Sequence, residues 1–180
     1  MTQRPPTQTP TQEAAYLEAY ESLRNNGYAH DPDWAQTLRA DAIGKFKEMG
    51  FPVARRGNEE WKYTDIRSIA TTPFHLPDSP ATLDLSDRRL RSVALGRLDW
   101  NRLAFVDGAY SERLSSLHSL PEGVRVVNLA EAMRSSSDIV QEHLARHADY
   151  QANPFVALNT AFMHDGALVS IPDGAIVEEP

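Results

Sequence analysis

The sequence predicts an α+β protein that begins with helices and ends in short strands. Apolar residues recur at helical spacing in residues 11–70, the pattern changes toward strands in residues 100–152, and residues 153–180 combine a short helix with two β-type runs. We expect residues 1–10 to form a disordered lead-in, because they are rich in Pro, Thr and Gln. The three prolines and several cap-prone residues within residues 71–99 predict a connector.

Two helices are expected in the amino-terminal region. The first runs from Thr11, a residue suited to capping, to Gly27. Its apolar residues share one face: Tyr16, Ala19, Tyr20 and Leu23. The second is expected to have Asp31 as its cap and Pro32 in its first turn, and Gly50 stops it. Its apolar residues follow at near four-residue spacing: Trp34, Leu38, Ala42, Phe46 and Met49.

Charged residues and large aromatic residues are interleaved between Gly50 and Ile66. One interpretation makes Trp61 and Ile66 a plug at the end of the helical region, with surface ion pairs among Arg55, Arg56, Glu59, Glu60 and Lys62. The other makes Trp61 and Tyr63 an interface anchor flanked by charge. The first interpretation is favoured, because surface ion pairs of this kind are common.

Strands and helices alternate between residues 100 and 152. A strand at 102–106 is expected to run into a tight turn at Asp107-Gly108 and to continue at 109–110. A Pro-Glu-Gly turn then leads into a half-buried strand at 124–127. A helical segment begins at Asn128, breaks at 135–138, and resumes along a face that extends to Tyr150. That face consists of Ile139, Val140, His143, Leu144 and His147.

The carboxy-terminal residues 153–180 read as the opening of a structure that the chain does not complete. Asn153 is expected to cap a short helix with Pro154 at its first position, and Asp165-Gly166 ends it. Two β-type runs follow, hinged by a Pro-Asp-Gly turn: residues 167–171 and 175–177. Two strands of this size cannot bury a face alone. We therefore expect the chain to be the amino-terminal part of something longer.

Composition excludes several classes of function. The net charge of −7 argues against a nonspecific nucleic-acid or anionic-membrane binder, and no apolar run approaches the length of a membrane span. The absence of Cys removes disulfides, thiolate ligands and Cys nucleophiles, and it suits a reducing compartment. Because the first dozen residues resemble no targeting signal, a cytoplasmic location is expected.

The strongest candidate for a metal site is the pair His143 and His147. An i, i+4 spacing would place both imidazoles on one side of a helix. However, Leu144 stands where a zinc-hydrolase helix carries Glu, and the third ligand would have to be a generic residue such as Asp149 or His164. Two exposed helix histidines are therefore favoured over a metal site.

Other combinations of reactive residues give weaker signals. His164 and Asp165 are adjacent, and Asp165-Gly166 is more typical of a turn than of an acid-base pair. Ser115, Ser116 and His118 lack a nucleophile elbow. The basic run at 88–91 lacks interleaved aromatics and indicates a solvated face, and no phosphate-binding glycine loop occurs. These residues predict a noncatalytic interaction module with no catalytic, cofactor-binding or metal-ligating residue.

Three stretches, taken in order, resemble one family. They are GNEEWKYTDI at 57–66, LAFVDGAY at 103–110 with Leu114-Ser115, and LNTAF at 158–162 with Asp165-Gly166-Ala167. The pattern resembles the SufB/SufD family of iron-sulfur cluster assembly proteins, and its SufD branch in particular. The E-x-W-K-Y-T-D stretch is the most specific of the three. The resemblance covers nearly the whole chain but only the first part of the family's length.

The resemblance implies a scaffold subunit with a helical amino-terminal region, a central right-handed parallel β-helix and a helical carboxy-terminal region that docks the ATPase SufC. The two runs within residues 167–177 would be the first rungs of that β-helix, which is otherwise missing. In the family, SufD pairs with SufB and two SufC subunits, and the complex assembles clusters for transfer to apoproteins. SufB-like and SufC-like partners are thus expected, with contacts mostly in the missing part. No functional residue carries over, and the iron-sulfur cluster would belong to the complex rather than to this fragment.

Three alternatives stay open at this point. A SufB-like paralogue is disfavoured by the W-K-Y-T-D motif and by the lack of Cys. A histidine-based metal hydrolase would use His143 and His147. A free-standing protein-interaction adaptor would be complete at Pro180.

Overall fold

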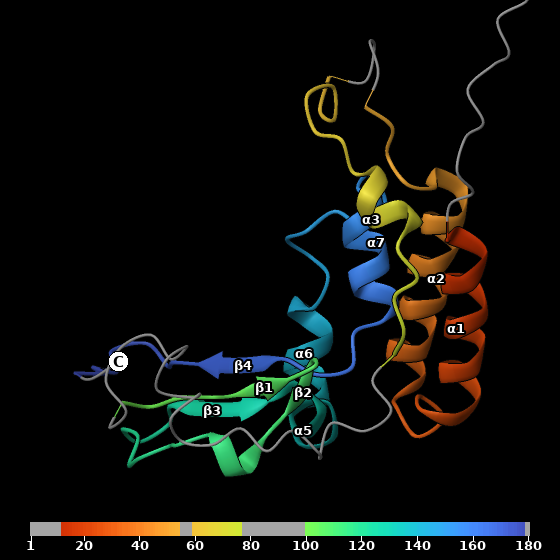
Figure 1. Ribbon diagram of the computed structural model, residues 1–180. Helices are drawn as coiled ribbons and strands as arrows, with labels where there is room; N and C mark the ends of the chain where they lie inside the picture. Colours follow the sequence, from red (N-terminus) through yellow and green to blue (C-terminus); the bar gives the residue numbers. More distant parts are fainter. Residues whose placement is uncertain (1–11, 55–58, 77–99, 179–180) are drawn as a thin grey trace, which may run out of the picture. The chain divides into compact units, whose positions relative to one another are not determined.

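The chain divides into two compact units, and each is built from two separate stretches of sequence. The structure, a computed structural model, describes residues 12–54, 59–76 and 100–178. Within these ranges, residues 12–54 and 59–76 together with Leu144–Phe162 form a helical unit, whereas residues 100–143 together with 163–178 form a sheet unit. Helices and short antiparallel strands occur together, which agrees with the expected α+β class (Figure 1).

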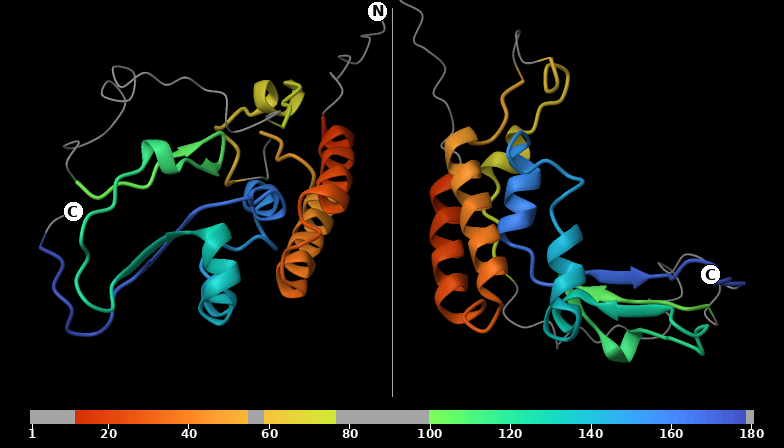
Figure 2. Two further views of the ribbon diagram at one scale, coloured as in Figure 1. Left: turned by 90° about the horizontal axis from the view of Figure 1, so that it is seen from below. Right: turned by 180° about the vertical axis from the view of Figure 1, so that it is seen from behind.

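The helical unit contains α1 (Glu13–Asn26), α2 (Asp33–Met49), α3 (Arg67–Thr71) and α7 (Pro154–Ala161). The ribbon views show α1 and α2 side by side (Figure 2), and α7 packs along α2 although it comes from the far end of the sequence. A single hydrophobic core joins these elements. Its fully buried members include Ala42, Phe46, Ala157 and Ala161.

Aromatic side chains from the two stretches of sequence meet in this core. The Tyr16 ring lies edge-on to Phe51 and Phe162, with centroid distances of 5.8 and 6.1 Å. The Phe46 and Phe51 rings lie 5.1 Å apart in the same arrangement. Edge-to-face pairs of this kind contribute roughly 0.5–1.5 kcal/mol each beyond the burial of their area. The aromatic residues therefore hold the carboxy-terminal stretch against the amino-terminal one.

The start of α2 differs from the sequence prediction. Asp31 does not cap the helix, because Pro32 occupies the N-cap position without a side-chain hydrogen bond. The Asp31 carboxylate instead lies 2.7 Å from Nη1 of Arg39, whose side chain is completely buried. The Arg39 guanidinium also lies 4.1 Å from the centre of the Tyr28 ring. Burial of this charge is stabilised by the carboxylate and the aromatic face together.

The buried face of α2 is correspondingly rotated from the predicted stripe. It consists of Ala35, Arg39, Ala42, Ile43 and Phe46. Trp34 and Leu38, which the apolar spacing placed on that face, are only half-buried. The helix α1 agrees with its prediction and ends at Gly27, whereas the expected cap Thr11 lies outside the described residues.

The helical face predicted to extend to Tyr150 is wrong beyond His143. The helix α5 (Leu129–Ser135) ends at Ser136, as expected, and α6 (Ser137–His143) then stops early. Ala145 adopts a positive φ of 58°, which is unfavourable for an L-residue within a right-handed helix. The chain turns here and enters the helical unit.

The cap predicted for the last helix is confirmed. The Asn153 side chain accepts hydrogen bonds from the backbone N–H groups of Phe155 and Val156, at 3.0 and 3.2 Å, and Pro154 follows at the first helical position. This pair of signals fixes the start of α7, because Asn satisfies orphan donors and Pro has no N–H to satisfy.

The sheet unit contains two antiparallel strand pairs. Strands β1 (Phe105–Val106) and β2 (Ala109–Tyr110) form a hairpin. Its turn residues Asp107 and Gly108 both have positive φ, at 49° and 82°, as the predicted tight Asp-Gly turn requires. The 3₁₀ helix η1 (Glu112–Leu114) follows.

The second strand pair corrects the prediction of two stacked runs at the carboxy-terminal end. Strand β4 (Ala167–Ser170) pairs with β3 (Arg125–Asn128), antiparallel, from Arg125 opposite Ser170 to Asn128 opposite Ala167. Residues 175–177 are not a strand. The Pro-Asp-Gly turn is present, with Gly174 at φ 79° and the Ala175 N–H bonded to the Pro172 carbonyl at 3.1 Å. The residues described here do not test the expected parallel β-helix.

Ionisation of the buried Tyr28 hydroxyl should lower the stability of the folded chain at alkaline pH. Its side chain is 2% exposed, and burial raises its pKa to about 12. Because the folded-state pKa lies above the unfolded value near 10, the stabilising contribution is complete below about pH 10 and is lost as pH rises toward 12. Tyr28→Phe should remove about 2 kcal/mol of this alkaline destabilisation, as measured by urea unfolding at pH 8 and pH 11.5.

Tyr63→Phe is the matched control, because Tyr63 is 88% exposed. It should leave the pH dependence of the wild-type chain unchanged. Equal alkaline destabilisation in wild type and Tyr28→Phe would contradict the assigned role of Tyr28.

Candidate interaction surface

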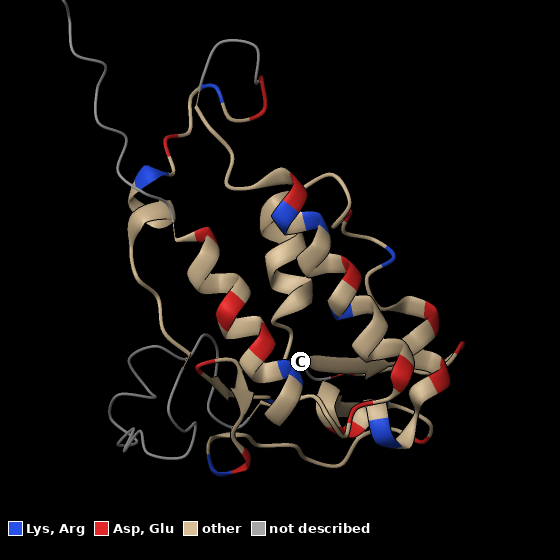
Figure 3. Cartoon of the chain, turned by 90° about the vertical axis from the view of Figure 1, so that its right-hand side faces the viewer, with Lys and Arg blue, Asp and Glu red and all other residues tan. Residues whose placement is uncertain are grey.

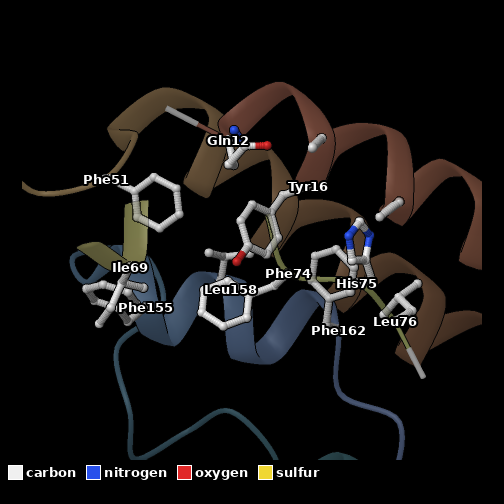
Figure 4. A pocket seen from close by; sticks show the side chains of 12 residues that line it. Gln12, Tyr16, Phe51, Ile69, Phe74, His75, Leu76, Phe155, Leu158 and Phe162 are labelled. Atoms are coloured by element: carbon white, nitrogen blue, oxygen red, sulfur yellow. The ribbon is translucent and has the colours of Figure 1, made fainter. Parts of the chain in front are cut away.

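An apolar groove lies on the helical unit, between α1, residues 72–76 and α7. Its volume is about 400 Å³, and its walls include Tyr16, Ile69, Phe74, Leu76, Phe155 and Phe162 (Figure 4). Phe74 and Leu76 are 56% and 42% exposed. A groove lined in this way favours apolar side chains of another polypeptide over a small polar ligand, because it offers few hydrogen-bonding groups.

The walls of the groove come from two separate stretches of sequence. On α7 and its C-cap, Phe155, Leu158 and Phe162 lie on one stripe at helical spacing, which the sequence predicted. On α1, the short side chains of Ala15 and Ala19 line the opposite wall and leave space between the helices. The groove therefore needs residues from both stretches of the helical unit.

The two prominent aromatic residues of the 59–66 stretch have different roles. The Trp61 ring lies 5.4 Å from that of Phe155, and Ile66 is 6% exposed, so both pack against the helical core as the plug interpretation predicted. Tyr63 points outward and Lys62 Nζ lies 5.1 Å from its ring centre. Lys62 also pairs with Glu59 at 3.4 Å. Arg55 and Arg56 lie outside the described residues.

Asp165 organises the sheet unit. Its carboxylate accepts hydrogen bonds from the backbone N–H groups of Tyr110, Ala130 and Gly166, at 3.0, 3.0 and 2.9 Å. The Asn128 side-chain amide donates a further bond at 3.2 Å. One side chain thus joins the β1–β2 hairpin, the first turn of α5 and the start of β4. The sequence prediction of a turn residue missed this role, since its partners lie 35 and 55 positions away.

The serine and histidine residues near position 115 support the expected structural role. The Ser115 hydroxyl donates to the Ser111 carbonyl at 2.8 Å and accepts from the Ala104 N–H at 2.9 Å. Ser116 Oγ lies 3.3 Å from Nε2 of His118, on the surface. Ser115 is therefore occupied in holding the backbone, and the contact between Ser116 and His118 is solvated.

The two histidines of the metal hypothesis do not share a helix face. His143 is the last residue of α6, and His147 follows in a bend beyond the positive φ of Ala145. Across residues 12–54, 59–76 and 100–178, no three His, Asp or Glu side chains are grouped so that they could hold a metal ion. The shared helix face that motivated the metal-site hypothesis is therefore absent. The basic run at 88–91 lies in a part of the chain that is not described.

These features indicate an α+β protein with an apolar groove on its helical unit. Among the helices of the described ranges, none combines the length and the hydrophobicity that a membrane span requires.

Comparison with known proteins identifies the family. A family model described as the SufBD protein N-terminal region matches residues 10–180. The chain therefore belongs to the SufB/SufD family, as its three motifs predicted. It is similar to an iron-sulfur cluster assembly SufBD family protein, slr0076, of a Synechocystis strain, with 24% identity over 141 residues. That alignment covers 78% of this chain and 29% of the relative. No solved structure matches the chain.

Asp165→Ala should destabilise the sheet unit by about 3 kcal/mol, because several backbone donors lose a charged acceptor. Hydrogen exchange at the amides of Tyr110 and Ala130 should accelerate, and this is the direct measurement. His164→Ala is the matched control, since His164 is exposed and adjacent, and it should change stability by less than about 0.5 kcal/mol. Unchanged protection of both amides in Asp165→Ala would refute the organising role.

Proposed function

We propose that this chain is the amino-terminal portion of a SufD-like scaffold subunit that takes part in iron-sulfur cluster assembly within a complex of SufB-like and SufC-like subunits. The observation that carries the proposal is the family match over residues 10–180. The name of the Synechocystis relative supports it, because that protein is described as an iron-sulfur cluster assembly protein. Since the alignment spans less than a third of that relative, the activity and partners of the whole protein are part of the proposal.

Two features favour the SufD branch over a SufB-like paralogue. The stretch from Glu60 to Asp65 carries the W-K-Y-T-D motif, and the 180 residues contain no Cys to supply a thiolate ligand. In the structure, Trp61 of this motif packs against Phe155, so the motif contributes to the closure of the helical unit.

The subunit acts through binding rather than through chemistry of its own. The side chains that resembled catalytic pairs have structural contacts: Asp165 holds the sheet unit together and Ser115 holds a turn. The helical unit offers an apolar groove. A scaffold needs such surfaces, and the cluster itself would be carried at the level of the complex.

Loss of the gene should lower the activity of iron-sulfur enzymes in the cell, most clearly under iron limitation, while an enzyme without a cluster keeps its activity. The tagged whole protein should copurify with both a SufB-like and a SufC-like subunit. Unchanged iron-sulfur enzyme activity in the deletion strain would refute the role in cluster assembly. Copurification of a SufD-like subunit in place of the SufB-like one would reassign the chain to the SufB branch.

The proposal also predicts that the purified chain holds no stoichiometric zinc or iron, because His143 and His147 do not converge on one helix face. Metal analysis of wild type and His147→Ala should give the same low content. One metal ion per chain that is lost in His147→Ala would instead support the metal-hydrolase alternative.

A further inference from the structure

A second groove runs along the helical unit between α1 and α2. Its volume is about 490 Å³. Its lining includes the half-buried Leu17 above the buried residues Tyr20 and Ile43. The small residues Ala40 and Gly44 lie one turn apart on α2. Ala40 is exposed and Gly44 is half-buried, so no large side chain projects from this part of α2.

No contact within the described part of the chain explains why position 44 is a glycine. It lies inside the 17-residue helix α2, where glycine is less favourable than alanine. Apart from its chain neighbours and the backbone of its own helix, a Cβ atom added at this position would meet no atom within 4 Å, and Gly44 is not among the residues with positive φ. Close packing inside the described chain therefore does not require a glycine here. A glycine on an open helix surface permits another backbone to approach closely.

The charges along the groove differ between its two sides. Glu18, Glu21 and Arg24 lie on α1, and Lys47 lies on α2. Glu21 is paired with Arg24 at 2.6 Å, whereas the described part of the chain provides no ion pair for Glu18 or Lys47. Both signs of charge are visible along the helices in Figure 3. A complementary ligand would carry a cation beside Glu18 and an acid beside Lys47.

We propose that this groove binds an amphipathic helix of a partner subunit, with the partner backbone closest to the chain at Gly44. The partner helix would place its apolar stripe over Leu17 and Ala40, a basic residue beside Glu18 and an acidic residue beside Lys47. Helix-in-groove binding uses this combination of an apolar floor and charged edges. The inference rests on the proposed function, because the partner is sought among the SufB-like and SufC-like subunits.

The test measures binding of the whole protein to purified SufB-like and SufC-like subunits, together with its own stability in urea. Gly44→Leu should weaken binding at least tenfold, because the side chain fills the place of the partner backbone. Gly44→Ala should weaken binding several-fold while raising the urea midpoint of the free protein. Glu18→Lys should weaken binding more at low salt than at high salt. Ser22→Leu, a similar enlargement on exposed α1 outside the groove lining, should leave binding unchanged.

The outcomes separate the two proposals. Wild-type affinity in both Gly44→Ala and Gly44→Leu would overturn the groove assignment and leave the proposed function standing. Absence of binding by the wild-type protein to either subunit would overturn the complex and the groove together. A loss of binding in Ser22→Leu equal to that in Gly44→Leu would also overturn the assignment, because it would show a general effect on α1.

Discussion

The packing of α7 against α2 is the contact on which the helical unit depends. It brings residues 154–161 back to a unit that the chain left after Leu76. The contact between α7 and α2 is apolar, and the rings of the carboxy-terminal stretch pack on α1, Phe51 and Trp61. Two polar contacts reinforce the return of this stretch to the unit. The Tyr150 hydroxyl donates to Asp41 at 2.7 Å, and the Asn153 amide lies 3.3 Å from Glu60. Because the core combines residues of both stretches, the helical unit is complete only when both are present.

As a result of this packing, the groove beside α7 and the core of the helical unit share residues. Tyr16, Phe155 and Phe162 contribute to both the aromatic core and the groove wall. The groove between α1 and α2 differs, because its walls come from a single continuous stretch. A partner that binds there would contact α1 and α2 only.

Sequence reasoning succeeded where a local signal determines the backbone. The Asn-Pro start of α7 and the Asp-Gly turn of the β1–β2 hairpin were both predicted, since each depends on the intrinsic preferences of one or two residues. The family was predicted from motifs, because the order of three short stretches is itself a local property of the sequence.

The failures concern interactions between distant residues. Periodicity assigned α2 a face without Arg39, because the spacing of apolar residues gives no sign that a buried charge meets Asp31 and Tyr28. The pairing of β4 with β3 and the role of Asp165 join positions far apart in the sequence, so no local pattern reveals them. Both grooves likewise form only when separate helices meet. The helix α6 ends at His143, shortly before the positive φ of Ala145, and apolar periodicity gives no sign of this turn.

The most direct test of this account compares amide hydrogen exchange of residues 12–54 in the whole chain and in a version that ends at His143. The account predicts a large loss of protection in α2 when the segment containing α7 is removed, because the aromatic core loses Phe155 and Phe162. Equal protection of α2 in the two proteins would contradict it, since the amino-terminal helices would then form a stable unit by themselves.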